Sequence, residues 1–187
     1  MTTRCPWAKS ELEIEYHDRE WGRPEHDDQK LFEMLILEGM QAGLSWSSIL
    51  KKRENMRAAF DGFDPLKLVE YDENKQAELM ANPGILRNRA KIRCLAVNAQ
   101  AFLKVQAEFG TFDRYLWAFV EHRPIVNHWK DFTEMPASTE ISQKMSKDLI
   151  KRGFKFIGPV ICYAYMQAVG LINDHLIDCK HHKLCQK

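Results

Sequence analysis

Long apolar runs are missing from this sequence of 187 residues. None approaches the roughly 18 consecutive apolar residues that a membrane-spanning helix needs, so we expect no membrane partner. The first residues, MTTRCPWAKSELEIEYHD, hold no apolar stretch of the kind that a signal peptide contains. We therefore expect a cytoplasmic protein.

An excess of charge is also missing. The chain has 27 Lys and Arg against 26 Asp and Glu, a net charge of +1. A nonspecific DNA coat protein is far more basic, so that class is excluded. A protein with a local positive face remains possible, because DNA binding depends on where the charges lie. Candidate clusters lie at 51–53, 87–93 and 151–155, and each can equally be a solvated helix face.

Cysteine is scarce, with five in the chain. Thiols stay reduced in the cytoplasm, so these residues are expected to be core thiols or metal ligands and not halves of disulfides. Internal repeats and low-complexity segments are absent as well. The length suits one domain, residues 1–187, with room for two lobes that share a core.

Strand-like alternation is absent, and helical periodicity dominates. We expect Asp28 to cap a helix that stops at Gly43, and Ser45 to cap the next one. The residues from His122 to Ser138 hold two prolines and no clear period, so we expect a loop. The fold class is therefore all-α. The other expected helices are a short one after Pro65 and longer ones at 74–81, 86–108, 112–121, 140–152 and 160–169.

Two cysteines and two histidines near the ends of the chain form a possible metal site: Cys5, His17, His175 and Cys179. The last two have an i, i+4 spacing that puts both on one helix face. Such a set can fill the four positions of a structural zinc ion and would tie the termini together. From spacing alone, we favour a buried thiol with surface histidines over a metal site. The pair His181 and Cys185 has the same spacing but lies in a tail, KHHKLCQK, that we expect to be polar and mobile.

Glu38 lies on an apolar helix face with Leu31, Met34 and Leu35, by their 3.6-residue spacing. A carboxylate there faces solvent at a helix end or faces a cavity, or it pairs with a nearby Lys or Arg, which is generically the more common case. Aromatic side chains favour the cavity, because a planar cationic base can stack between them. Four aromatics fall in the same quarter of the chain, although core packing also explains such residues: Trp7, Tyr16, Trp21 and Trp46.

The segment ANPGILRNRAK separates two expected helices. We expect Gly84 to take a positive φ there, so that the second helix begins at once. The N–H groups of Gly84 and Leu86 would then form an anion site at a helix N-terminus, with Arg87 beside it. Such a helix–hairpin–helix grips DNA phosphates without sequence preference.

Taken together, these residues resemble the bacterial 3-methyladenine DNA glycosylase I family along nearly the whole chain. The segments that carry the resemblance are CPW, EYHDREWGRP, LFEMLILEGMQAGLSW, ILKKRENMRAAF, GILRNRAKI, KRGFKFIGPVICYAYMQAVG and NDHLIDC. The resemblance implies a helix–hairpin–helix DNA glycosylase fold, with one lobe holding the termini and the other holding the hairpin.

The resemblance also implies roles for single residues. It assigns one structural zinc to Cys5, His17, His175 and Cys179. It implies that Glu38 reads the damaged base, with Tyr16, Trp46, Trp7 and Trp21 around it, and that Leu44 enters the gap left by the flipped base. Ser47 and Ser48 depart from the apolar residues expected there, and no role is assigned to the loop at 122–138.

The expected activity is that of a monofunctional N-glycosyl hydrolase, acting as a monomer on double-stranded DNA that contains alkylated bases. Methylation at N3 makes adenine a cation and weakens its glycosidic bond, so recognition is the main task. No Asp follows the hairpin in IRCLAVNAQAFL to act as a base. Two other classes remain open: a DNA-binding module without chemistry, and a zinc-stabilised interaction domain.

Overall fold

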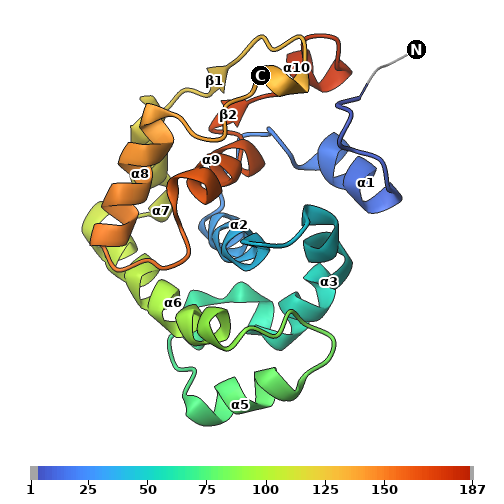
Figure 1. The fold of residues 1–187 in the computed structure, drawn as a ribbon. Coiled ribbons are helices and arrows are strands. Elements are labelled where there is room, and N and C mark those ends of the chain that lie inside the picture. The colour runs from blue at the N-terminus through green and yellow to red at the C-terminus, as the bar shows by residue number, and fades with distance from the viewer. Residues whose placement is uncertain (1–3, 186–187) are drawn as a thin grey trace.

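The computed structural model describes residues 4–185, which fold mainly into helices joined by turns and loops (Figure 1). The α-helices are α1 (Glu11–Arg19), α2 (Asp28–Gln41), α3 (Trp46–Ala59), α4 (Pro65–Leu68), α5 (Glu73–Ala81), α6 (Arg89–Phe109), α7 (Phe112–Trp117), α8 (Glu140–Lys151), α9 (Pro159–Ala168) and α10 (Lys180–Leu184). Short 3-10 helices and two strands complete the set: η1 (Asp61–Phe63), η2 (Ala118–Val120), η3 (Phe132–Glu134), β1 (Ile125–Val126) and β2 (Ile172–Asn173). None of the helices in this part of the chain has the length and apolar character needed to cross a bilayer.

Helix α2 lies at the centre of the molecule, with α3, α6, α7 and α9 around it (Figure 1). Every side chain from Leu31 to Met40 is buried, which explains why its sequence is apolar on nearly all sides. Glu38 is among these buried residues, so its carboxyl group does not face bulk solvent at a helix end. The alternative of a solvent-facing Glu38 is therefore excluded.

The cap of α2 lies one residue earlier than expected. The carboxylate of Asp27, not that of Asp28, accepts a hydrogen bond from the N–H of Lys30. Asp28 instead accepts from the N–H groups of Phe112 and Asp113 at the start of α7. A local capping rule cannot predict this contact, because it joins two helices that are far apart in the sequence.

The other expected helices are confirmed with small shifts at their ends. Ser45 caps α3 through the N–H of Ser48, as expected. Helix α1 was not expected, although Ser10 and Glu13 form a capping box, which is a recognisable sequence signal. Helix α6 begins at Arg89 and not near Leu86, so the turn before it is longer than expected.

The described segments near the two ends of the chain, at Cys5 and Cys179, come together in the structure. The segments around β1, β2 and α10 lie at the top of the view in Figure 1. There β1 pairs in parallel with β2, so part of the expected 122–138 loop forms a short strand. The expectation that the tail is polar and mobile is wrong for its described part. His181, His182 and Cys185 are buried in and beside α10. The ring of His181 packs against His17 and His175, whereas His182 lies against the carbonyl oxygen of Asn127.

Candidate functional site

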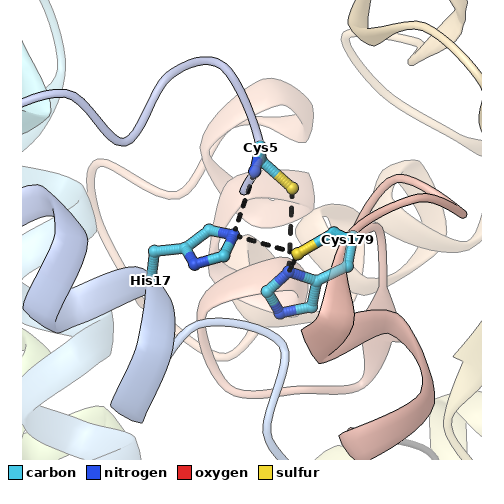
Figure 2. Close-up of side chains that lie close together, drawn as sticks. Cys5, His17 and Cys179 are labelled. Atoms are coloured by element: carbon cyan, nitrogen blue, oxygen red, sulfur yellow. Dashed lines mark hydrogen bonds between the residues drawn. The ribbon is translucent and has the colours of Figure 1, made fainter. Parts of the chain in front are cut away.

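The four candidate metal ligands come together in the structure, from α1, the N-terminal segment and the segment before α10 (Figure 2). All four are buried, and their ligand atoms lie within 4.8 Å of one another. Cys179 Sγ is 3.6 Å from both His17 Nε2 and His175 Nδ1, and Cys5 Sγ is 3.7 Å from His175 Nδ1. In a tetrahedral zinc site, bonds of roughly 2.3 Å to sulfur and 2.0 Å to nitrogen place such S and N atoms roughly 3.5 Å apart. The cluster can therefore hold a metal ion.

Neighbouring groups fix the orientation of both histidine rings. His17 Nδ1 lies 2.8 Å from the carboxylate of Asp18, which Arg4 binds in turn at 2.8–3.0 Å. His175 Nε2 lies 2.9 Å from the carbonyl oxygen of Trp21. Each ring therefore donates outward and turns its unprotonated nitrogen toward the cluster, as metal-binding histidines do. A hydrogen bond from the Cys5 thiol lowers the pKa of Cys179, which favours one thiolate in the pair.

A second feature is a cavity of about 350 Å³ between α1, α2, α3 and α9. All five residues expected to bind a base line it: Trp7, Tyr16, Trp21, Glu38 and Trp46. Five further residues line it that the sequence did not single out: Glu13, Gln41, Phe132, Ala164 and Gln167. We call this cavity the base pocket. Larger cavities elsewhere among residues 4–185 lack this combination of aromatic rings and a buried carboxyl group.

The aromatic rings of the base pocket pack edge to face and tilted against one another. Trp7 and Trp21 have ring centroids 5.0 Å apart, and Tyr16 and Trp46 have centroids 5.2 Å apart. The indole N–H groups of Trp7 and Trp46 are buried without a hydrogen-bond partner among the described residues. Tyr16 and Trp21 also belong to the hydrophobic core, so core packing is confirmed for these two, and both line the cavity as well.

Glu38 is 4% exposed, and no hydrogen bond or ion pair from residues 4–185 reaches its carboxyl group. The expected alternative, pairing with a nearby Lys or Arg, is therefore not what the structure shows. Burial raises the pKa of Glu38 to about 8. Burial also raises the pKa of Tyr16, and the nearby Glu38 adds to that effect. A buried acid without a partner is costly unless a ligand supplies one.

The turn after α2 projects a large apolar side chain into solvent. Gly43 has a φ of +82°, which ends the helix as expected, and Leu44 is 44% exposed. The ammonium group of Lys91, on α6, donates to the carbonyl oxygens of Met40 and Ala42 at 2.8 and 2.6 Å. Lys91 is thus buried and holds this turn, so it does not belong to a free phosphate-binding cluster.

The hairpin between α5 and α6 differs from expectation in its glycine. Gly84 does not have a positive φ, and its N–H donates to the side chain of Asn82 at 2.8 Å, so it is not free for a phosphate. The space at Gly84 is tight, because a Cβ would come within 3.1–3.3 Å of side-chain atoms of Asn82 and Asn55 and would push them aside by a few tenths of an ångström. Leu86 packs partly against the core, and Arg87 is exposed.

Other basic residues of the expected clusters support the protein itself. Lys52 braces the hairpin by donating to the carbonyl oxygens of Pro83 and Ile85. Arg53 binds Glu33 and Glu20 at 2.8 Å each. The cluster at 51–53 is therefore mostly structural, and the exposed cations that remain near the hairpin are at 87–93.

Comparison with known proteins places the chain among methyladenine glycosylases. The family model for methyladenine glycosylase matches residues 7–183. DNA-3-methyladenine glycosylase of Haemophilus influenzae is 50% identical over 180 residues, which cover 96% of this chain and 97% of that protein. A crystal structure of a 3-methyladenine DNA glycosylase I is 46% identical, with a TM-score of 0.93, over 95% of this chain and 98% of that one. The 3-methyladenine DNA glycosylase I from Staphylococcus aureus, solved to describe 3-methyladenine recognition, is 35% identical, with a TM-score of 0.92 over 95% of each chain.

The similarity covers both ends of the chain and the helices that build the base pocket. It confirms the expected helical glycosylase fold and the resemblance seen in the sequence. The chain belongs to the methyladenine glycosylase family.

Proposed function

We propose that this protein is a DNA-repair glycosylase that flips 3-methyladenine out of alkylated DNA and releases it by hydrolysis. The observation that carries the proposal is the buried carboxyl of Glu38, which has no protein partner within the described chain and lies in an aromatic pocket of about 350 Å³. A cationic base gives this group the positive charge and hydrogen-bond donors that it lacks. The names of its relatives support the same activity.

Recognition follows from charge and hydrogen bonding. The positive charge of the methylated base offsets the cost of ionising Glu38, whose pKa is raised to about 8. Stacking against the rings of Tyr16 and Trp46 adds ~1–3 kcal/mol per base. Undamaged adenine is neutral and leaves the carboxylate poorly satisfied, so it binds weakly. Glu38 acts mainly by discrimination.

The reaction needs little further help from the protein. A water oxygen forms a bond to the sugar C1′, and the N-glycosidic bond breaks with its electron pair going to the base. The base leaves as a neutral molecule, and the attacking water releases its extra proton to solvent. Because the leaving group starts as a cation, it requires no general acid. In this step Glu38, which lines the pocket that holds the base, stabilises the positive charge that develops on the sugar.

Extrusion of the base leaves a gap in the duplex, at a cost of a few kcal/mol. We propose that Leu44 enters this gap, because its apolar side chain projects from a turn that Lys91 holds in place. The hairpin at Leu86 and Arg87 would grip the phosphates of one strand. The N–H of Gly84 donates to Asn82, so it would not bind a phosphate directly. Gly84 would contribute instead by letting the hairpin backbone approach the DNA strand closely.

We further propose that the cysteine and histidine cluster binds one structural zinc ion. Four protein ligands fill a tetrahedral site, so the ion would stabilise the join between the termini and take no part in chemistry. The S to N separations of 3.6–3.7 Å and the outward hydrogen bonds of both rings support this assignment. We expect the enzyme to act as a monomer in the cytoplasm, which is consistent with its free cysteines.

The test is chromatography of the bases released from methylated DNA. We expect wild-type protein to release 3-methyladenine and Glu38→Gln to lose most of this activity. Glu15→Gln is the matched control, because Glu15 is exposed on α1 and pairs with Arg19 one turn away. A wild-type protein that binds DNA without releasing a base would support the DNA-binding module instead. Absence of salt-sensitive DNA binding would support an interaction domain.

A further inference from the structure

Gln167, in the last turn of α9, lines the base pocket and points its amide in a defined direction. Its Nε2 donates to Oδ2 of Asp174 at 2.7 Å. A carboxylate only accepts hydrogen bonds, so the amide nitrogen has to face Asp174. The amide oxygen accepts no hydrogen bond from residues 4–185, so it is free to accept one from a ligand in the pocket that Gln167 lines.

Asp174 is completely buried, outside the base pocket, and binds three other donors. Asn127 and Trp129, from the 122–138 loop, donate to Oδ1 at 2.7 Å each, and Tyr163 donates to Oδ2 at 2.5 Å. Its four donors leave the carboxylate well satisfied and fixed in place. Rotating the Gln167 amide by about 180° would bring two acceptor oxygens within 2.7 Å of each other, which is strongly unfavourable.

We propose that Gln167 is a second hydrogen-bond acceptor for the flipped base and selects bases that carry an exocyclic amine. Asp174 is the positioning residue that holds the amide oxygen toward the base. This proposal rests on the proposed glycosylase function and deepens it, because it names what separates one class of alkylated purine from another.

The chemical basis is the difference between the two purines at C6. Adenine carries an amine there, which donates, whereas guanine carries a carbonyl oxygen, which accepts. An amide oxygen held by Asp174 can accept from the amine of 3-methyladenine. It opposes the carbonyl oxygen of 3-methylguanine, and it cannot turn its nitrogen inward without losing the bond to Asp174. A fixed acceptor therefore rejects guanine more strongly than a free glutamine would.

The test uses Gln167→Met, which keeps the length of the side chain and removes the acceptor. Asp174 keeps three donors in this variant, so the fold should persist, and thermal unfolding checks this. Release of 3-methyladenine and 3-methylguanine is measured from the same methylated DNA. We expect kcat/KM for 3-methyladenine to fall about tenfold, and its preference over 3-methylguanine to fall by a similar factor.

Asn127→Ala is the matched control. It removes a different donor from the same carboxylate, also at 2.7 Å, but Asn127 does not line the base pocket. We expect its preference to match that of the wild type. If Gln167→Met keeps the wild-type preference, or if Asn127→Ala changes it as much, the proposal is wrong.

Binding of the two free bases, followed by quenching of tryptophan fluorescence, provides a second readout that does not depend on excision. Gln167→Leu is measured beside Gln167→Met, so the result does not rest on one substitution. Loss of preference in binding supports the proposal, and equal preference in all variants overturns it. If wild-type protein releases neither base, the proposed function itself fails, which is a distinct result.

Discussion

Replacing Glu38 by Gln should make the folded protein more stable, and the gain should grow with pH. Glu38 is 4% exposed and has no described partner, and burial raises its pKa from 4.5 to about 8. The folded state therefore holds a proton on Glu38 between pH 4.5 and 8 that the unfolded state has lost. Stability in this window falls as pH rises, because the folded state binds more protons.

The size of the effect follows from the two pKa values. Each pH unit within the window costs the wild type up to about 1.4 kcal/mol. Between about pH 5.5 and 8.5 the loss amounts to about 3 kcal/mol of unfolding free energy. The amide introduced by Glu38→Gln does not titrate, so the variant lacks this loss. All other groups titrate alike in both proteins and cancel in the difference.

The assay is urea unfolding of wild type and Glu38→Gln at about pH 5.5, 7 and 8.5, followed by fluorescence or circular dichroism. We expect the stability difference to favour Glu38→Gln increasingly as pH rises. A difference that stays constant over this range would refute the reasoning, since it would mean that Glu38 is ionised in the free protein.

Three further predictions concern the metal site, the turn that carries Leu44 and the hairpin. Elemental analysis should find about one zinc per chain in protein purified without chelator. The variant Cys179→Ser should lose the metal and unfold at a lower temperature. A wild-type protein without metal would contradict the assignment. Lys91→Met should lower the unfolding free energy by about 2–3 kcal/mol, because two carbonyl groups of the turn lose their hydrogen-bond donor. It should also reduce base excision more than it reduces binding of free 3-methyladenine. Equal losses in excision and in binding would show that the turn held by Lys91 has no separate role in excision. Arg87→Ala should weaken binding to all DNA sequences alike and reduce the steepness of log affinity against log salt concentration by about 1. An unchanged slope would show that Arg87 does not contact the DNA phosphates.

Local sequence signals were sufficient for much of the fold. The 3.6-residue period identified α2 and placed Glu38 on an apolar face, and Ser45 and Gly43 set the ends of the adjoining helices. These signals act within one or two turns, because capping and turn formation involve neighbouring residues. The capping box of Ser10 and Glu13 was equally local, and it would have identified α1.

Long-range contacts decided what local rules did not. Asp28 was expected to cap its own helix but instead caps α7, 84 residues further along the chain. Gly84 was expected to supply a positive φ, but it does not; instead Asn55 from α3 approaches it closely and donates to its carbonyl oxygen. Lys91 looked like a surface cation and is buried, because the carbonyl groups at the end of α2 lie beside it.

The sequence by itself determined the helical class, the family and the chemical character of the site: a carboxylate among aromatic rings, and two Cys–His pairs at the ends. Spacing alone left the metal cluster open, because Cys5 and His175 are 170 residues apart and only the fold brings them to 3.7 Å. The tertiary structure also decided that Glu38 is buried without a partner among the described residues and that Gln167 lines the same pocket. These properties depend on which distant segments surround a side chain, and periodicity along one helix does not carry that information.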